Sequence, residues 1–452
     1  MKRLLLLLCA STSIAVSLPE GHTETVDALY RAAHDTTMAY DRLKVLCETI
    51  GHRLSGSQAL EDAIDWAVEG MTEDGFVVQT QDVLVPHWER NEESLTMLEP
   101  MPRDLQILGL GMTVGGEVEA EVVVVSSFDE LETVDVEGKI VLYDVPFTTY
   151  GETVRYRGGG PSAAARKGAV GVLVRSVTPD SLYTPHTGAT RYADDAPKIP
   201  AAAVTIEDAV WMHGLHDAGI PIKVKLSLGA EHHPDATSRN VIADLPGREK
   251  PDEAVVVGCH LDSWDLGTGA LDDGAGCGIV VGAAMLIAGL DERPRRTIRV
   301  VLYGAEEVGL FGATAYAREH GDDLDKHVLA SESDFGAGPI WRFQTRFGEA
   351  ALPCARTIQN LLMPLGVTPD DNRAFGGPDI GILARAGVPV VTPGQNGMDY
   401  FDYHHTPDDT FDKIKPDEFR QNIAVYAAFA YIAAETGWDF RKQPEPEDIG
   451  TE

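Results

Sequence analysis

Apolar residues recur with two different spacings in the second half of the chain. Short apolar runs typical of buried strands alternate there with longer segments that have the 3.6-residue period of a helix. Strands that alternate with helices in this way predict an α/β fold, with a mostly parallel central sheet flanked by helices. The expected strands are 240–245, 254–259, 297–303, 328–331 and 388–392, and the expected helices are 275–290, 310–319 and 416–435.

The segment from residue 106 to residue 229 has a different pattern. Its short apolar strands are separated by glycine-containing and acidic turns, and it holds no obvious cluster of catalytic side chains. This pattern predicts an inserted β-rich domain at 106–229, which leaves 24–105 and 230–440 as one discontinuous domain. Its expected elements are strands at 120–126, 139–143, 171–174, 200–204 and 223–228, the last resembling an edge strand, and a helix at 162–167.

The chain before this insertion is expected to be mainly helical. A helical period runs through 24–49, a loop covers 51–57, and a second helix is expected at 60–71. Prolines within 86–102 indicate a stretch with few strands. The opposite end, 441–452, is acidic and is expected to form a disordered tail.

The first 17 residues have the features of a secretory signal peptide. Lys2 and Arg3 precede an apolar run, and Ala15-Val16-Ser17 resembles a cleavage site. Thr12 and Ser13 interrupt the run, and no other stretch approaches the ~20 apolar residues that a membrane span needs. We therefore expect a secreted or periplasmic protein without a membrane span.

The composition limits the partners of the protein. The 452 residues include 71 Asp and Glu against 37 Lys and Arg, which gives a formal charge of −34. This excess disfavours nucleic acids and anionic membranes as partners, because little positive charge is present to neutralise phosphates. Apolar residues make up 44% of the chain, enough for a sizeable core. We expect the acidic residues to form a solvated surface.

The cysteines have no spacing typical of a metal or redox motif. Past the signal segment they are Cys47, Cys259, Cys277 and Cys354. Cys259 and Cys277 lie in apolar runs and are expected to be small buried residues. Two alternatives remain for the cysteines: a disulfide, if the compartment is oxidising, and a lipid anchor at Cys9.

Side chains of the kinds that bind metals follow the expected strands, one after another. In open α/β sheets, functional groups gather at the carboxyl ends of the strands. We therefore expect one site at one edge of the sheet. The side chains are His260 and Asp262 after 254–259, Asp272 and Asp273 before the long helix, Glu306 and Glu307 after 297–303, Glu332 and Asp334 after 328–331, and His404 and His405 in a late loop.

Histidines and carboxylates at one edge suit a pair of divalent cations with mixed nitrogen and oxygen ligands. In such sites a carboxylate bridges two metals about 3.5–4 Å apart, and Asp272, on a turn that faces both halves, is the natural bridge. Asp262 would accept the second imidazole N–H of His260 and so fix its ring. Of Glu306 and Glu307, one would bind metal while the other moves a proton.

Each of these patterns alone also has an ordinary structural explanation. A His-x-Asp at a strand end is commonly a satisfied polar pair, and Asp-Asp-Gly is commonly a turn with a helix cap. Paired glutamates commonly complement the first turn of a helix, and His-His-Thr-Pro is commonly a surface loop. Their order on consecutive strand ends favours a functional site over independent coincidences.

These residues resemble the ordered motifs of the M28 family of zinc peptidases, and the similarity covers nearly the whole mature chain. The segment from His260 to Asp265 most resembles the carboxypeptidase Q-like members of the family, and 106–229 resembles a protease-associated (PA) domain. Ser55-Gly56-Ser57 and 238–243 are similar to flanking signatures. The matching motifs are His260-x-Asp262, Gly269-Ala270-x-Asp272-Asp273-x-x-Gly276, Glu306-Glu307-x-Gly309, Glu332-x-Asp334 and His405-Thr406-Pro407-x-Asp409-Thr410.

The resemblance implies two Zn²⁺ per chain and a homodimer. His405 fits the position of the His in the His-Thr-Pro motif and is favoured as a ligand over His404. Asp408 and Asp409 are expected to stabilise the loop, and Asp409 stands at a position that resembles a motif Asp. Glu306 would be the general base and Asp262 the partner of His260. The implied ligands are His260 and Asp334 for one zinc, Glu307 and His405 for the other, and Asp272 as the bridge.

The expected activity is hydrolysis of dipeptides or short peptides with a free N-terminus, by water that the metals activate. The resemblance at Ser263-Trp264-Asp265 favours a dipeptidase, which recognises both termini, over a broad aminopeptidase. A glutaminyl cyclase is disfavoured, because that chemistry uses one zinc. A non-catalytic, receptor-like binding ectodomain remains an alternative. Such relatives lose metal-ligand residues, however, and none of these residues is missing from this sequence. The insertion would either cover the active site or contact partners.

Overall fold

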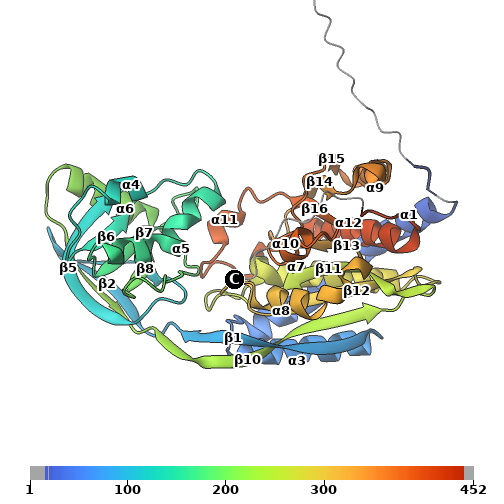
Figure 1. The fold of residues 1–452 in the computed structure, drawn as a ribbon, viewed down its shortest axis with the longest axis horizontal. Helices are drawn as coiled ribbons and strands as arrows, with labels where there is room; N and C mark the ends of the chain where they lie inside the picture. The colour runs from blue at the N-terminus through green and yellow to red at the C-terminus, as the bar shows by residue number, and fades with distance from the viewer. Residues whose placement is uncertain (1–15, 19, 442–452) are drawn as a thin grey trace, which may run out of the picture.

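The computed structural model describes residues 16–18 and 20–441 and shows two lobes that lie side by side (Figure 1). Each lobe of the described chain contains one eight-stranded sheet. We call the body formed by 22–89 and 231–441 the large lobe and the body formed by 93–228 the small lobe. The predicted signal peptide and acidic tail lie outside the described residues, apart from residues 16, 17 and 441.

The sheet of the large lobe confirms the predicted α/β class. Its strand order is β1-β10-β12-β11-β13-β16-β14-β15, and the central strands β12, β11, β13 and β16 are parallel. Antiparallel pairs flank this core, β10 beside β12 and β14 beside β16. The strands are β1 Val77–Glu89, β10 Glu231–Leu245, β11 Lys250–His260, β12 Arg296–Tyr303, β13 His327–Glu332, β14 Ile340–Arg346, β15 Thr368–Pro369 and β16 Val390–Gln395.

Helices cover both faces of this sheet, because apolar residues of its buried strands point alternately to either side. Val255 and Val257 of β11 pack into a cluster with α1, α2, α3, α7, α9 and α12, whereas Ala254 and Val256 pack into a cluster with α8 and α10. The helices are α1 His22–Asp35, α2 Met38–Val45, α3 Gln58–Glu73, α7 Ala275–Ala288, α8 Phe311–Glu319, α9 Leu352–Leu362, α10 Ile380–Arg385, α11 Tyr400–Tyr403 and α12 Pro416–Glu435.

The helix predicted at 24–49 is interrupted, because Thr36 adopts an extended conformation between α1 and α2. The helix α7, together with the turn before it, is the one segment of the described chain that is long and apolar enough to cross a membrane. Within this segment, 78% of the most apolar window is buried inside the fold. Ala270–Ala288 is therefore the core helix of the large lobe.

The small lobe is a second mixed sheet, of order β3-β2-β9-β5-β6-β7-β8-β4. Its strands are β2 Glu93–Glu99, β3 Arg103–Leu105, β4 Ile107–Gly109, β5 Gly116–Val125, β6 Ile140–Tyr143, β7 Gly171–Arg175, β8 Ala201–Val204 and β9 Lys223–Leu228. Its helices are α4 Phe128–Leu131, α5 Tyr150–Arg166 and α6 Ile206–Asp217.

Three expectations about this part of the chain are wrong. The strand β9 lies between β2 and β5 and is not an edge strand. The helix predicted at 162–167 begins at Tyr150, where the Thr149 side chain accepts the N–H of Glu152 and caps it. The stretch 86–102, which was predicted to have few strands, contains the end of β1 and all of β2. Pro86 is tolerated in β1 because it lies at an irregularity in the β-ladder, between Val85 and His87.

Both crossings of the chain between the lobes run through one antiparallel ribbon (Figure 1). The strand β1 pairs with β10 from Val77 opposite Asp244 to Glu89 opposite Glu231. Four residues beyond Glu89, the pairing of β2 with β9 begins with Glu93 opposite Leu228. The small lobe therefore begins at about Glu93, earlier than the predicted boundary at residue 106.

The lobes meet through close contacts beside this ribbon. The Arg90 guanidinium donates two hydrogen bonds to the Asp265 carboxylate, at 2.8 and 2.7 Å. Gly111 of the small lobe lies so close to Trp264 of the large lobe that a Cβ added to Gly111 would come within 1.9 Å of the Trp264 ring. The two lobes therefore pack closely against one another at Gly111.

A Gly111→Ala substitution should loosen this junction. Since the Trp264 ring is buried and cannot move away freely, we expect a loss of about 1–3 kcal/mol in unfolding free energy, measured by denaturant unfolding. Gly158→Ala in α5 is the control, because a Cβ there would meet no atom within 4 Å. Gly158→Ala should be at least as stable as the wild type, since alanine favours a helix, and the close fit would be disproved if Gly111→Ala unfolded at the wild-type midpoint.

Candidate metal centre

The ligand-type side chains predicted from the sequence converge at the carboxyl edge of the large-lobe sheet. His260 is the last residue of β11, Glu306 and Glu307 follow β12, and Asp334 follows β13. These strands are parallel, so their carboxyl ends meet at one edge. His405 reaches the same place from the loop after α11.

Asp272 lies at the centre of this cluster. Its Oδ1 is 3.1 Å from Nε2 of His260, and its Oδ2 is 3.2 Å from Nε2 of His405. The two carboxylate oxygens therefore face two different groups of potential ligands, as a carboxylate that bridges two cations must.

Each side of Asp272 has a further carboxylate. On one side, Nε2 of His260 is 3.7 Å from Oδ1 of Asp334, and on the other, Nε2 of His405 is 3.1 Å from Oε2 of Glu307. The second oxygen of Glu307 is buried and has no hydrogen-bond partner in the part of the chain that the structure describes. Such an orphaned buried oxygen fits a metal ligand.

The two neighbouring histidines differ in how closely they approach the carboxylates. The rings of His404 and His405 are stacked with centroids 3.6 Å apart, but Nε2 of His404 is 3.5 Å from Asp272 and, among the described residues, pairs with no other carboxylate. His405 approaches both Asp272 and Glu307 more closely. This placement favours His405 as the ligand, although either ring offers a nitrogen to the cluster.

The far nitrogens of the two ligand-type histidines are held by backbone carbonyls. Nδ1 of His260 donates to the backbone oxygen of Asp262 at 3.0 Å, closer than the 3.5 Å to the Asp262 carboxylate. That carboxylate instead accepts the backbone N–H groups of Glu306 and Glu307. Asp262 thus positions three members of the site, rather than His260 alone as the sequence suggested.

The corresponding acceptor for His405 comes from the small lobe. Nδ1 of His405 donates to the backbone oxygen of Thr187 at 3.1 Å, and Arg157 donates to the same oxygen at 3.0 Å. The backbone N–H of Thr187 donates in return to the oxygen of His405. No residue pattern in the sequence could have identified Thr187, because it acts through its main chain.

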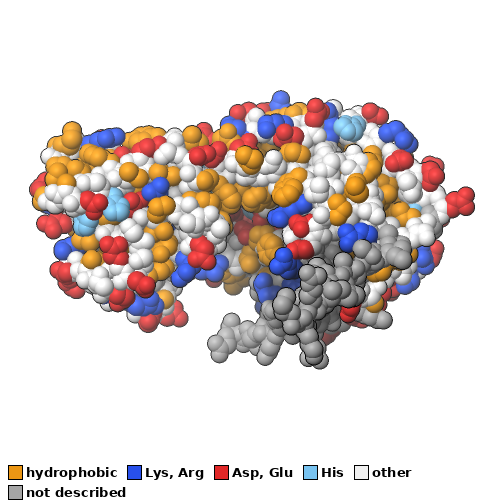
Figure 2. All heavy atoms as spheres, turned by 90° about the horizontal axis from the view of Figure 1, so that it is seen from above, with side chains coloured by type: hydrophobic (Ala, Val, Ile, Leu, Met, Phe, Trp, Pro, Cys, Tyr) orange, Lys and Arg blue, Asp and Glu red, His pale blue; other side chains and the backbone are white. Residues whose placement is uncertain are grey.

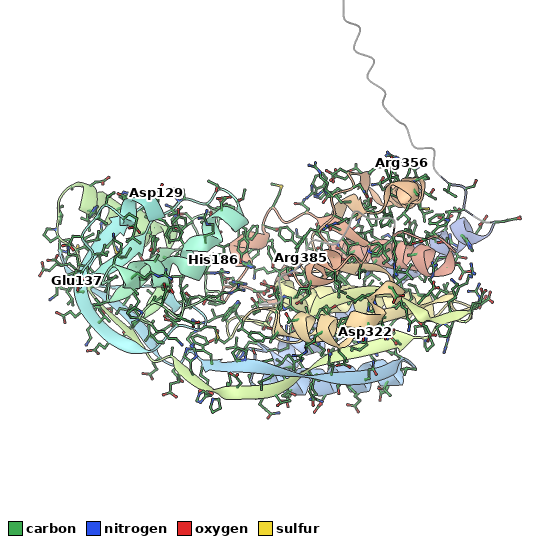
Figure 3. The ribbon with its side chains drawn as sticks, viewed as in Figure 1. Asp129, Glu137, His186, Asp322, Arg356 and Arg385 are labelled. Atoms are coloured by element: carbon green, nitrogen blue, oxygen red, sulfur yellow. The ribbon has the colours of Figure 1, made fainter. Side chains whose placement is uncertain are left out.

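A second small-lobe histidine holds the neighbouring residue. Nδ1 of His186 donates to the backbone oxygen of His404 at 2.8 Å, and Figure 3 shows His186 on the side of the small lobe that faces the large one. Burial lowers the pKa of His186 to about 3, so it is a neutral donor at physiological pH. The small lobe thus fixes the loop that carries both histidines.

Negative charge dominates the interior of the site. Burial, together with the neighbouring Asp272, raises the pKa of Glu307 to about 7, and burial together with Asp334 raises that of Glu332 to about 8. Burial likewise raises the pKa of Glu306. Burial opposes ionisation of Asp272 too, but His260 and His405 hold its pKa well below the usual range. The cluster therefore has more carboxylates than its histidines neutralise, which is the electrostatics of a cation site.

Two buried residues hold the loops that carry the cluster. Arg53 donates from its guanidinium to the backbone oxygens of Leu261, Thr268 and Gly269, at 2.7–2.9 Å. Asp409 accepts the backbone N–H groups of Ala270, Leu271 and Asp272, at 3.0, 2.6 and 3.2 Å. The loop-stabilising role expected of Asp409 is confirmed, and it orients the central Asp272. The role of Arg53 was not foreseen, since a lone arginine in a loop carries no signal.

Access to the cluster is narrow. A small pocket beside it is lined by Trp264, Leu266, Glu307, His405 and Thr406, among others. Figure 2 shows a hollow between the two lobes with hydrophobic side chains around it. Tyr150 of the small lobe stacks on Phe401 of the large lobe, with ring centroids 5.3 Å apart, and helps to enclose this region.

Asp409→Asn should weaken cation binding without changing the ligand set. An amide has one acceptor oxygen, so it cannot satisfy all three N–H groups that position Asp272, and we expect affinity to fall about 10–100-fold. The measurement is zinc occupancy in dialysis against buffered free zinc. Asp408→Asn, at the exposed neighbouring position, is the control and should match the wild type. Equal occupancy in both variants would contradict this role of Asp409.

Two family models match the chain. The model described as peptidase family M28 matches residues 240–430, and the PA domain model matches residues 116–212. The first falls within the large lobe and the second within the small lobe.

The chain is also similar to known proteins over most of its length. Carboxypeptidase Q of Mus musculus is 42% identical over 403 residues, which cover 88% of this chain and 86% of the relative. Carboxypeptidase Q of Homo sapiens is 41% identical over 414 residues, with 90% and 87% covered. The solved structure of a peptidase M28 precursor from Shewanella amazonensis has a TM-score of 0.91 at 40% identity, covering 94% of this chain and 99% of that one. A zinc aminopeptidase from Bacillus subtilis, at 20% identity and a TM-score of 0.65, shares the fold; the match covers 89% of this chain and 98% of that one.

Proposed function

This chain belongs to peptidase family M28, and we propose that it is a two-zinc exopeptidase that hydrolyses dipeptides or short peptides with a free N-terminus. The observation that carries the proposal is the position of Asp272, whose two oxygens face His260 and His405 at 3.1 and 3.2 Å. A single carboxylate between two groups of nitrogen and oxygen ligands is the arrangement that a two-metal hydrolase needs.

The ligand assignment follows the two sides of Asp272. His260 and Asp334 would hold one zinc, Glu307 and His405 the other, and Asp272 would bridge them. Imidazole nitrogens and carboxylate oxygens are suitable zinc ligands. The buried, unpartnered Oε1 of Glu307 among the described residues supports this fit, as does the excess of carboxylates around it.

When bound, the two zinc ions would lower the pKa of a water molecule and polarise the scissile carbonyl. Glu306 would take the proton from that water and deliver it to the leaving amine. It lies beside Glu307, and its backbone N–H is fixed by the Asp262 carboxylate at 3.0 Å. Its side chain is less buried than that of Glu307, so it can face a substrate.

The small size of the proposed substrate is supported by the small lobe. The backbone oxygen of Thr187 and the imidazole of His186 hold the loop with His404 and His405, and the pocket beside the cluster is small. Of the two roles considered for the insertion, covering the site is therefore the one we propose. Similarity to carboxypeptidase Q over most of the chain favours a dipeptidase over a broad aminopeptidase.

The cellular setting of the proposal comes from the sequence. Export to the periplasm or the medium is predicted from residues 1–17, and a homodimer is predicted from the family resemblance. A binding ectodomain without catalysis is disfavoured, because each implied ligand has the residue type that zinc requires and lies in the cluster.

Glu306→Gln should reduce kcat by about 10²–10⁴-fold, because glutamine cannot move a proton. Zinc content should stay at the wild-type value, since Glu306 is not among the proposed ligands. Metal analysis and dipeptide hydrolysis measure the two quantities on one preparation. Glu349→Gln, at an exposed position, is the control. A fully active Glu306→Gln enzyme would refute this mechanism.

The substrate class is tested with matched dipeptides whose termini are free, N-acetylated or C-amidated, each assayed with zinc and with a chelator. We expect cleavage of the free dipeptide alone and its loss with the chelator. Cleavage of C-amidated substrates as well would identify an aminopeptidase. A zinc-loaded protein that cleaves none of them would overturn the proposal.

A further inference from the structure

We propose that the ribbon between the lobes carries a separate transition-metal site, formed by His87, Glu89 and His233. It shares no residue with the cluster around Asp272 and does not depend on the proposed function. The three side chains form one of the groups in the described chain whose ligand atoms all lie within 4.8 Å of one another.

The pairing of the ribbon explains why these residues converge. His87 of β1 lies directly opposite His233 of β10 in the antiparallel ladder, and directly opposed side chains share a face. Glu89 is two residues further along β1, so it points to that same face. The intervening Trp88 points the other way, is 2% exposed, and donates from its ring nitrogen to Thr113.

The distances from Glu89 to the two histidines are close to those of ligands on one ion, and the two imidazoles lie within 4.8 Å of one another. Nε2 of His233 is 3.4 Å from one Glu89 oxygen, and Nε2 of His87 is 3.7 Å from the other. Two ligand atoms at about 2.0–2.1 Å from a tetrahedral zinc lie about 3.3 Å apart. Small side-chain rotations would therefore complete three coordination positions and leave the fourth to water.

His233 supplies independent support. Its Nε2 is shielded from solvent and makes no hydrogen bond within residues 16–18 and 20–441. The rings of His87 and His233 lie 4.6 Å apart at an angle of 36°. A shielded nitrogen without a hydrogen-bond partner, beside a second imidazole and 3.4 Å from a carboxylate oxygen, fits a metal ligand. Two imidazoles and a carboxylate suit Zn²⁺, Ni²⁺ or Cu²⁺ rather than Mg²⁺ or Ca²⁺.

The position of this site indicates what the metal would do. It lies just beyond the irregularity between Val85 and His87, and a Cβ on Gly56 would be 2.8 Å from Cβ of His87. Ser55 also donates to the backbone oxygen of Pro86 at 2.9 Å. A bound ion would therefore link β1 to β10 where both strands leave the large lobe, and would fix the ribbon rather than take part in catalysis.

The test compares zinc stoichiometry after dialysis of the full chain against buffered Zn²⁺. We expect His233→Gln and His87→Gln each to bind one zinc fewer than the wild type, whatever number binds elsewhere. Peptide hydrolysis, where the wild type shows it, should be unchanged and shows that the variants are folded. His232→Gln, which alters the exposed neighbour of His233, should keep the wild-type number.

Cu²⁺ provides a second readout that needs no activity. Cu²⁺ added to the zinc-loaded chain should displace zinc from this partly exposed site, because Cu²⁺ binds such ligands more tightly. Its electron paramagnetic resonance spectrum should then show coupling to two imidazole nitrogens, reduced in either variant. The proposal fails if the two variants bind as many zinc ions as the wild type. It also fails if His232→Gln loses as much zinc as His233→Gln, since the binding would then be adventitious.

Discussion

The burial of negative charge is the constraint on which the large lobe depends. Asp262, Asp272, Asp273, Glu307, Glu332, Asp379 and Asp409 all lie buried at one end of its sheet. A buried carboxylate without a partner is costly to ionise. Asp262, Asp273, Glu332 and Asp409 therefore accept backbone N–H groups, Asp272 lies among histidines, and burial raises the pKa of Asp273, Glu332 and Asp379. Because the compensating N–H groups belong to neighbouring loops, the electrostatics also determine how those loops are folded against one another.

The same constraint explains why the two lobes act as one unit. Nδ1 of His405 needs a hydrogen-bond acceptor. That acceptor is the backbone oxygen of Thr187, which belongs to the small lobe and not to the large one. Arg157 brings its positive charge to the same place, at 3.3 Å from His405. The family of the small lobe alone would not have shown this, because PA domains are identified by their strands, whereas this contact is made by a main-chain carbonyl between strands.

The sequence predicted best where a local pattern decides the structure. The bounds of α12 agree with the prediction at 416–435, since Pro416 marks its first turn and a long run of helix-forming residues follows, although the helix is buried on all sides from Asn422 on. The ligand-type residues were placed in one cluster because parallel strands bring their ends together. The ribbon was missed, because prolines near residue 86 suggested loops and the pairing of β1 with β10 spans more than 140 residues. Arg53 and Thr187 were missed because their roles depend on backbone groups far away in the chain.

The ribbon also bears on how such a two-lobed chain could have arisen. Entry and exit are neighbours, with Glu89 opposite Glu231, so the whole small lobe is topologically the enlarged tip of one β-hairpin. An ancestral sheet closed by a tight turn at this point would have had the same ladder and the same register. Acquisition of a module at a hairpin tip disturbs none of the strands that carry His260, Glu307 and Asp334. The small lobe nevertheless supplies the carbonyl that orients His405, so closing the hairpin with a tight turn would leave that imidazole nitrogen without its acceptor.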